Sequence, residues 1–425
     1  MHITILTIGS RGDVQPYLAF AVSLKNAGYH VRLATHAKFE QDIRAYGLEF
    51  ALINGNPQDA FTSEAGQKFM QTKNPLMMPS RFAQALEPIM KTAIEDSWNA
   101  CQGTDVIIAG SIVFWGFDIA QKLRVPFYYA AMQPFTATKE FPIQGTPPEW
   151  EKFGGWYNKL TYQVLNQIFW FIFRNSTNQF RHNILKMPKL GIYPPPLTYM
   201  KRAKINFLNA ISPLVVPKPS DWLEHEHMTG YWFLDAPSDF VPPKDLVEFI
   251  QAGSPPVYIG FGSMAGKQAE KVAEIALAAL IKTKQRGIFL TGWSEIENIE
   301  LPENIFKISA ISHDWLFPQM ACIVHHGGAG TTAATFRAGV PGIIIPFLGD
   351  QAFWGYRSRK LGVSPATITY NKLNEDNLAV AIMKGIEDKD IRQKAAILGE
   401  NIRAENGVKA AVEIIEKTLY TKNYL

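Results

Sequence analysis

The sequence predicts an α/β protein with two doubly wound, Rossmann-like domains that face each other across a cleft. Short apolar runs alternate with amphipathic stretches in the first half, and the alternation restarts after a proline-rich stretch at 213–243. Glycine-rich turns also follow several of the apolar runs. Strand–helix alternation is typical of a parallel sheet covered on both faces, which binds its ligands at the carboxyl ends of the strands.

Composition narrows the class of protein further. The 425 residues suffice for two to three domains at about 100–200 residues each, and a charged fraction of 19% argues against disorder. Two cysteines, Cys101 and Cys322, exclude a disulfide scaffold or a cysteine metal site and fit a reducing cytoplasm. The net charge of +4 is too small to indicate a nucleic-acid partner. The start MHITILTIG lacks a basic region and predicts a strand rather than a signal peptide, so we expect a cytoplasmic protein.

The elements of the first half follow from their patterns. Residues 3–8 form a short apolar run typical of a strand, and 14–26 has the apolar spacing of a helix. The same reasoning predicts strands at 31–34, 49–53, 106–109 and 127–131, and helices at 39–46 and after Ser111. The long spacers 54–79 and 133–156 are rich in Gly, Pro and Asn, and such loops are commonly functional.

The second half repeats the pattern after a break. The stretch 213–243, with one short apolar run at 231–234, is interpreted as a linker region. Beyond it we predict strands at 257–261, 288–290, 306–308, 322–325 and 343–346, with helices at 267–283, after Gly330 and through to the end. We therefore expect an N-terminal domain at 1–212 and a C-terminal domain at 244–425, whose terminal helices can pack back on the first domain.

The first candidate site is the turn Gly9-Ser-Arg-Gly12-Asp13-Val-Gln-Pro16, between the first strand and the first helix. Its glycines permit a tight backbone, and Asp13 lies near the helix N-terminus, where a carboxylate also serves as a cap. The pattern alone leaves both roles open. The G-x-x-G spacing fits a dinucleotide fingerprint poorly.

The second candidate site is the turn His325-His326-Gly327-Gly328-Ala329-Gly330-Thr331-Thr332. Small residues let the backbone approach a ligand, and the following helix directs free N–H groups at it, which favours a phosphate or diphosphate. Either histidine could donate a hydrogen bond to a departing phosphate. The alternative is a plain glycine turn with a hydrogen-bonded histidine.

The third candidate site is Pro346-Phe-Leu-Gly-Asp350-Gln351, which follows another strand. A carboxylate beside an amide suits a polyhydroxyl ligand, because Asp accepts hydrogen bonds while Gln both donates and accepts. The turn Gly260-Phe-Gly262-Ser263 adds backbone and hydroxyl groups for a phosphate.

These motifs carry a family resemblance. GSRGDVQP, YIGFGSM, HHGGAGTTAA and PFLGDQAFWG, with ISPLVVPKPSDW and TGYWFLD between the halves, resemble inverting, nucleotide-sugar-dependent glycosyltransferases of the GT-B fold. The resemblance spans nearly the whole chain and is to the UDP-glycosyltransferase family, in the branch of sterol 3-beta-glucosyltransferases and bacterial antibiotic glycosyltransferases. It implies that 1–212 binds the acceptor and 244–425 the nucleotide-sugar donor.

The resemblance also implies residue roles. Asp13 matches the catalytic base, which is a histidine in plant relatives. Asp350 and Gln351 match the sugar-binding pair, and a glutamine there is associated with glucose donors. Ala333 stands where plant relatives have a glutamate for the ribose, so UDP and dTDP both stay open as donor nucleotides. The matching diphosphate positions are Ser263, His325, Gly330 and Thr331, and Gly262, Gly327 and Gly328 complete the expected donor-binding set.

The implied reaction is a single in-line displacement with inversion. A carboxylate with a pKa of about 3.9 cannot deprotonate a free alcohol beforehand, so Asp13 takes the acceptor's proton as the new bond forms. His325 and the helix N-terminus would stabilise the departing diphosphate, so we expect no metal and no cofactor beside the substrate UDP-glucose. The strings Asp388-Lys-Asp390 and His225-Glu-His227 are interpreted as solvated surface residues rather than metal ligands.

The stretch 152–220 is basic and aromatic. It has no Asp or Glu but ten Lys and Arg, and it carries Trp156, Tyr157, Tyr162, Phe169, Trp170, Phe171 and Phe173. It either rests on an anionic membrane, for instance the inner membrane face, or has aromatics in the core and an ordinary solvated basic face.

Three functions stay open at this point. The leading one is glucose transfer from UDP-glucose to a hydroxyl of a hydrophobic, sterol-like acceptor, which gives a β-glucoside. The second is transfer from a UDP- or dTDP-sugar to a polyketide, phenolic or peptide natural product. The third is a non-catalytic sugar-nucleotide-binding partner, which the joint presence of Asp13, His325, Asp350 and Gln351 disfavours.

Overall fold

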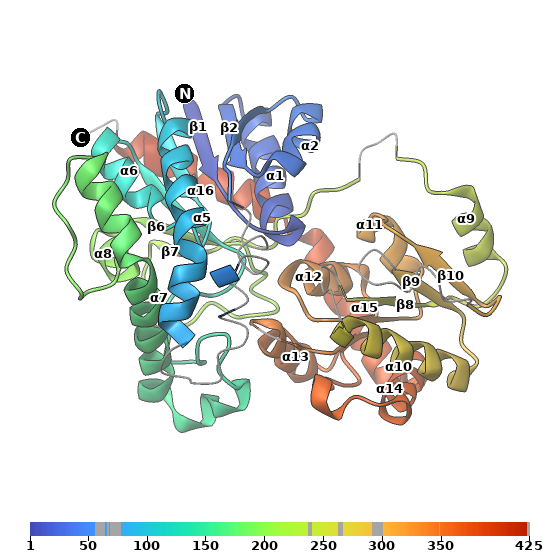
Figure 1. Ribbon diagram of the computed structural model, residues 1–425. Helices are drawn as coiled ribbons and strands as arrows, with labels where there is room; N and C mark the ends of the chain where they lie inside the picture. Colours follow the sequence, from blue (N-terminus) through green and yellow to red (C-terminus); the bar gives the residue numbers. More distant parts are fainter. Residues whose placement is uncertain are drawn as a thin grey trace.

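The computed structural model describes residues 1–55, 64–65, 68, 78–236, 240–261, 267–290, 301–347 and 349–422. These residues form two α/β bodies, each with a central parallel sheet (Figure 1). The first sheet holds, in spatial order, β3 (Glu49–Leu52), β2 (His30–Thr35), β1 (His2–Leu6), β4 (Val106–Ala109), β5 (Phe127–Ala131), β6 (Asn206–Asn209) and β7 (Glu226–Met228). The second holds β10 (Ile305–Ile308), β9 (Gly287–Leu290), β8 (Val257–Gly260), β11 (Cys322–His325) and β12 (Gly342–Ile344). The predicted fold class is confirmed.

The helices lie on both faces of the sheets. Those of the first body are α1 (Arg11–Asn26), the 3₁₀ turn η1 (Ala37–Phe39), α2 (Glu40–Ala45), α5 (Met78–Ala100), α6 (Gly116–Leu123), the 3₁₀ helix η2 (Pro148–Phe153), α7 (Gly155–Asn183) and α8 (Pro196–Arg202). Those that follow are α9 (Lys244–Gln251), α10 (Lys267–Thr283), α11 (His313–Leu316), η4 (Phe317–Gln319), α12 (Ala329–Ala338), α13 (Gln351–Lys360), η5 (Tyr370–Lys372), α14 (Glu375–Glu387), α15 (Lys389–Ala404) and α16 (Gly407–Lys422).

Each sheet has one point where the strand order reverses. In the first sheet the chain runs outward from β1 to β2 and β3 and then returns to β4 on the other side of β1. In the second sheet the reversal lies between β8 and β11, which pair in parallel with His325 beside Gly260. Ligands of doubly wound sheets bind at the carboxyl ends of the strands at such points. The turns after β1, β8 and β11 are therefore the turns that the topology favours as sites.

The hydrophobic cores explain the near-continuous apolar strands. In the first body, one face of the sheet packs on α1 and α16, and the other packs on α5, α6 and α7. The second sheet likewise has α10 and α14 on one face and α11 with η4 on the other. A strand buried on both faces has no polar face to alternate with, and β4 and β5 are accordingly buried along their whole length.

A separate apolar cluster joins the two bodies. It combines Phe141, Tyr162 and Val215 of the first body with Phe336 and Trp354 of the second. α16 adds a second connection, because it leaves the second body and packs against α1 of the first (Figure 1). Its side chains Ala411, Val412, Ile415 and Leu419 are part of the first body's core.

Part of the stretch interpreted as a linker belongs to the first sheet. β7 lies within 213–243 and pairs in parallel with β6. Glu226, which was expected to be solvated, is fully buried and forms an ion pair with Lys201. That expectation was wrong because strands are recognised from a periodic pattern of apolar residues. A three-residue edge strand inside a proline-rich stretch is too short to show such a pattern.

Candidate functional site

Asp13 lies in the first turn of α1 and is a member of its cap. The backbone N–H and the hydroxyl of Ser10 both donate to Asp13 Oδ2, each at 2.8 Å. The bond from the Ser10 backbone is the carboxylate half of a capping box, which fixes an acidic side chain at a helix N-terminus. Among the described residues no hydrogen bond engages the other oxygen, Oδ1. The cap therefore orients Asp13 without using both of its oxygens, so the two roles left open by the sequence are compatible.

The backbone under Asp13 requires a glycine. Gly9 has a φ of +136°, and a Cβ there would lie 2.5 Å from Asp13 Oδ2. The Gly9 N–H donates to His36 Nε2 at 3.0 Å, while His36 Nδ1 bonds the Ile53 carbonyl at 3.0 Å. Because Nε2 accepts, the proton of His36 resides on Nδ1. His36 thus supports the turn that presents Asp13.

Burial raises the pKa of Asp13, and the two hydrogen bonds from Ser10 oppose that shift. Desolvation disfavours the charged form of a carboxyl group, which makes the ionised form a stronger proton acceptor. A general base needs this property.

The second turn connects β11 to α12. Gly327 has a φ of +90°, and a Cβ on it would approach Ile344 to 2.6 Å. Gly328 is the N-cap residue of α12, and a Cβ on Gly330 would meet nothing within 4 Å. Gly330 and Thr331 lie in the first turn of the helix, where backbone N–H groups have no intrahelical partner. The turn can therefore bind an anion through its backbone.

His325 of this turn is buried, His326 is partly buried, and both rings are neutral. His325 is fully buried, and its Nδ1 accepts the Gly327 N–H at 3.1 Å. Burial holds the pKa of His325 well below its usual range and lowers that of His326 to about 4. The His325 Nε2 and His326 Nδ1 atoms have no hydrogen-bond partner within the part of the chain that is described. His325 in this arrangement supports the glycine turn, so any contact with a ligand requires its buried Nε2 to become accessible.

Asp350 and Gln351 begin α13 and pack against the same turn. The Trp354 indole donates to Asp350 Oδ2 at 2.7 Å, and the Phe347 N–H donates to Gln351 Oε1 at 2.7 Å. A Cβ on Gly327 would lie 3.1 Å from the Gln351 carbonyl oxygen, so the two motifs are in contact. Burial raises the pKa of Asp350, the hydrogen bond from Trp354 opposes that shift, and the charge of Asp13 adds to it.

The two bodies meet at this point. Gln133, which follows β5 in the first body, donates from Nε2 to Asp350 Oδ2 at 3.4 Å. The charge of Asp13 also contributes to the raised pKa of Asp350, and α1, which carries Asp13, contacts α12. The structure thus brings together Asp13 of the first turn with the 325–331 and 350–351 motifs.

Two sequence-predicted residues, Gly262 and Ser263, lie outside the described residues. Ala333, which replaces the ribose-binding glutamate of plant relatives, is buried in the cluster between the two bodies and cannot contact a ligand there. Asp388 caps α15, and Asp390 pairs with Lys394 one turn later, as the surface interpretation requires.

Sequence reasoning missed three polar residues at the site: His36, Gln133 and His313. His36 and Gln133 each follow a strand of the first sheet, so the carboxyl-end position of a polar residue was a usable signal. His313 begins α11, stacks on Phe317 and influences the pKa of His325. Burial lowers the pKa of His313 to about 4.

Comparison with known proteins agrees with this geometry. Residues 3–142 match the glycosyltransferase family 28 N-terminal domain, and residues 289–418 match the erythromycin biosynthesis protein CIII-like C-terminal domain. Sterol 3-beta-glucosyltransferases are 36% identical in Cryptococcus neoformans var. neoformans serotype D (strain JEC21) and 38% identical in Candida albicans, each over 100% of this chain. The chain spans 28% of the length of both relatives.

Solved structures with the same fold are antibiotic glycosyltransferases. The calicheamicin glycosyltransferase CalG4 has a TM-score of 0.69 at 15% identity, with 98% of each chain covered. The glycosyltransferase SnogD from Streptomyces nogalater has a TM-score of 0.67 at 16% identity, with 98% of this chain and 99% of that chain covered.

The two facing parallel sheets define the GT-B fold, which these solved glycosyltransferase structures share. Over its whole length the chain is similar to the fungal sterol 3-beta-glucosyltransferases, and its two matched ends are similar to a glycosyltransferase family 28 domain and to an erythromycin biosynthesis protein CIII-like domain.

Proposed function

We propose that the protein transfers glucose from UDP-glucose to the hydroxyl group of a sterol-like acceptor with inversion, giving a β-glucoside. The observation that carries this proposal is the hydrogen bond from Gln133 to Asp350 where the two bodies join, with Asp13 near enough for its charge to raise the pKa of Asp350. A base from the acceptor-side body beside a sugar-binding carboxylate from the donor-side body is the arrangement that in-line transfer requires.

The residues divide the work as follows. The acceptor oxygen attacks the anomeric carbon, its proton passes to Asp13 Oδ1, and the bond between that carbon and the diphosphate breaks on the opposite face. Asp350 and Gln351 bind the sugar hydroxyls. The diphosphate lies at the N-terminus of α12, where Gly327, Gly328, Gly330 and Thr331 offer backbone N–H groups.

We propose that the transfer needs neither a cofactor nor a bound metal. Developing negative charge would be stabilised by the free N–H groups of α12 and by Ser263. His325 and His326 are uncharged before the donor binds, because burial lowers the pKa of both. A bound diphosphate would raise these pKa values, since an opposite charge favours the protonated ring.

The test is a matrix of donors and acceptors. The protein is incubated with UDP-glucose or dTDP-glucose against a sterol, a flavonoid and a macrolide, and product mass and anomeric configuration are measured. A β-sterol glucoside from UDP-glucose alone is the expected result. Transfer only to the flavonoid or macrolide would replace the sterol with a natural-product acceptor, and no glucoside from any pairing would favour a non-catalytic binding partner.

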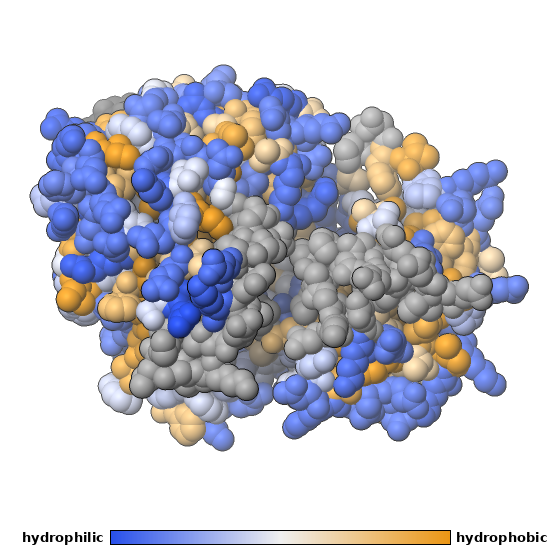
Figure 2. Space-filling model, viewed as in Figure 1, coloured by the Kyte–Doolittle hydropathy of each residue, from blue (hydrophilic) through white to orange (hydrophobic). Residues whose placement is uncertain are grey.

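We further propose that α7 and the adjoining η2 rest on an anionic membrane surface. Trp156 and Phe171 are 78% and 67% exposed, and Val164 and Ile168 are exposed between them at spacings that keep all four on one face of α7. Phe153 of η2 extends this apolar face. In Figure 2, apolar residues interrupt the polar surface in the region where Figure 1 shows α7. An exposed apolar face with basic neighbours is typical of interfacial helices.

The charges of 152–220 are only partly available to lipid. Lys159, Arg181 and Lys201 form ion pairs with Asp221, Asp118 and Glu226, all of which lie outside the stretch. Among the aromatic residues, Tyr162, Trp170 and Phe173 are buried. The core interpretation therefore applies to these three, and the membrane proposal rests on the exposed remainder.

Among the described residues, no helix combines the length and the apolarity needed to cross a bilayer. Both cysteines are free and buried, which suits the reducing cytoplasm in which we place the protein.

Vesicle sedimentation tests the membrane proposal. The protein should sediment with phosphatidylserine-containing vesicles at low salt and be released at high salt. A Trp156→Glu/Phe171→Glu variant should lose sedimentation and keep turnover on detergent-dispersed sterol, whereas Val380→Glu, at a site 69% exposed on α14, should behave like the wild type. No sedimentation of the wild type, or equal sedimentation of the double variant, would overturn the proposal.

A further inference from the structure

Three potential metal ligands lie together at the amino ends of β1, β2 and β3, the end of the sheet opposite the Gly9 turn. His2 and His30 are direct partners in the parallel register of β1 and β2, and Glu49 opens β3. Glu49 Oε2 lies 3.3 Å from His2 Nε2 and 3.8 Å from His30 Nδ1. All three ligand atoms lie within 4.8 Å of one another, and this is the only such group among the described residues.

These separations approach those of a zinc site. Zinc binds imidazole nitrogen and carboxylate oxygen at about 2.0–2.2 Å in tetrahedral geometry, which places neighbouring ligand atoms roughly 3.3–3.5 Å apart. Two imidazoles with one carboxylate favour zinc over magnesium, which prefers oxygen ligands. The three side chains need only small rotations to surround one ion.

The state of His2 supports a ligand role. Its Nε2 is buried and has no hydrogen-bond partner within the described part of the chain, although a carboxylate oxygen lies 3.3 Å away. A buried imidazole nitrogen that lacks a hydrogen-bond partner and lies beside a carboxylate is available to bind a metal ion.

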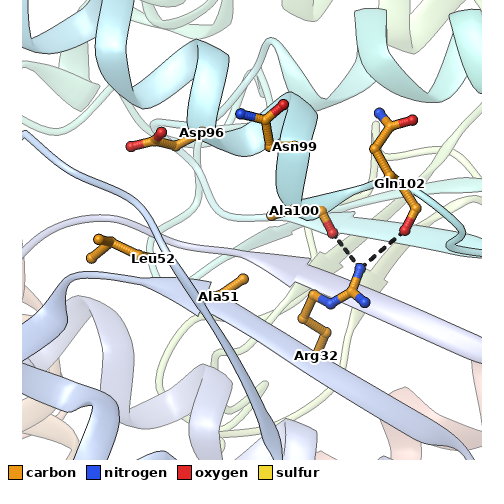
Figure 3. A pocket seen from close by; sticks show the side chains of 7 residues that line it. All are labelled: Arg32, Ala51, Leu52, Asp96, Asn99, Ala100 and Gln102. Carbon is orange, nitrogen blue, oxygen red and sulfur yellow. Dashed lines mark hydrogen bonds between the residues drawn. The ribbon is translucent and has the colours of Figure 1, made fainter.

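Glu49 is oriented by a neighbouring side chain. Arg32 Nε donates to Oε1 at 2.7 Å, which leaves Oε2 for the histidines. Arg32 is itself fixed by the carbonyls of Ala100 and Gln102, as Figure 3 shows. The guanidinium thus positions the carboxylate, and its positive charge weakens the attraction of the site for a cation without occupying the ligand atoms.

We propose that His2, His30 and Glu49 bind one zinc ion, with water as the remaining ligand. The ion would join three adjacent strands at the end of the sheet away from the catalytic residues. Its role is therefore structural, and glucose transfer does not depend on it.

Isothermal titration of the untagged, metal-stripped protein with zinc tests the site. His30→Gln is the first variant, because the His30 side chain is 70% exposed and its replacement leaves the core intact. The exposed His182 on α7 provides the matched control, His182→Gln. We expect one zinc per chain for the wild type and the control, binding weaker by at least about tenfold in His30→Gln, and no binding of magnesium.

Thermal melting gives an independent readout. Zinc should raise the melting temperature of the wild type and of His182→Gln, and should do so less for His30→Gln and for Glu49→Gln. Equal zinc affinity in His30→Gln and the wild type would overturn the proposal, as would wild-type zinc binding no tighter than magnesium binding. Turnover of UDP-glucose, measured with and without chelator, should be unchanged throughout.

Discussion

The turn after β1 and the turn after β11 both border the point where the strand order of their sheet reverses, yet they present different chemical groups. The first directs a side chain, Asp13, whose Oδ2 is held by Ser10. The second presents mainly backbone, since Gly327, Gly328 and Gly330 leave the N-terminus of α12 uncovered. The same topology therefore presents a carboxylate in one sheet and backbone N–H groups in the other, and a few residues of the turn determine which.

Replacing Asp13 with Asn should have the largest effect. We expect kcat to fall by about 10²–10⁴, because general base catalysis contributes that much, while the KM for UDP-glucose stays near the wild-type value. The amide oxygen can still accept the hydrogen bonds from Ser10, so the cap survives. Steady-state kinetics checks this, with Ser10→Ala as the control for a purely structural effect. Full turnover of Asp13→Asn would remove Asp13 from the base role.

Two glycine variants of the second turn distinguish an effect on stability from an effect on donor binding. Gly327→Ala should lower the free energy of unfolding by roughly 1–3 kcal/mol, because its φ is +90° and its Cβ would meet Ile344. Gly330→Ala should keep wild-type stability, because its Cβ meets no protein atom, but should raise the donor KM several-fold. Denaturant unfolding and donor titration measure the two effects. Equal stability of both variants would contradict the distinction.

The pH dependence of kcat/KM and of stability should reflect the ionisation of Asp13 in the turn after β1. Burial raises the pKa of Asp13, so kcat/KM should fall at acid pH with a midpoint above the ordinary aspartate value of about 3.9. Because the native pKa is raised, destabilisation by Asp13 begins as the pH rises above the unfolded-state pKa and is complete above the native pKa. Asp13→Asn should therefore be at least as stable as the wild type at pH 7, with the difference vanishing below the unfolded-state pKa. If Asp13→Asn matched the wild type in stability at pH 3 but were less stable than the wild type at pH 7, the expected direction of the effect would be contradicted.

Gln133→Ala should have the smallest effect. Its hydrogen bond to Asp350 is long, at 3.4 Å, and a bond worth about 0.5–1.5 kcal/mol corresponds to at most roughly a tenfold change. We expect a rise of a few-fold in the donor KM with little change in kcat. Asn175→Ala, at an exposed position of α7, provides a control without contact to Asp350. A kcat loss as large as that of Asp13→Asn would show that Gln133 acts in the chemical step.

What the sequence predicted at the site is local in character. Gly9, Asp13 and the 325–331 turn lie in short motifs whose chemistry is readable from neighbouring residues. His36 and Gln133 were missed because their roles depend on strand order: each reaches the site only because β2 and β5 end at the same edge as β1. The roles of Gly262 and Ser263 stay predictions.

The fold was predictable to a similar depth. The alternation of apolar runs gave two parallel sheets, which the structure confirms. β6 and β7 were missed because they contain few apolar residues: β6 is Asn-Phe-Leu-Asn, and β7 is Glu-His-Met within a proline-rich stretch. The burial of His325 could not be predicted either, because a sequence motif does not determine the orientation of the imidazole ring.

α16 has a consequence for biosynthesis. Its residues 411–419 complete the core around α1, yet a ribosome releases them only after all five strands of the second sheet have been made. The core of the first body therefore stays incomplete, with an apolar surface exposed, until the second body has been synthesised. We expect the two bodies to complete folding together rather than one after the other. In the folded protein, α16 connects the two bodies, because it follows the second in sequence and packs against α1 of the first. We expect this packing to limit how far the two bodies can separate.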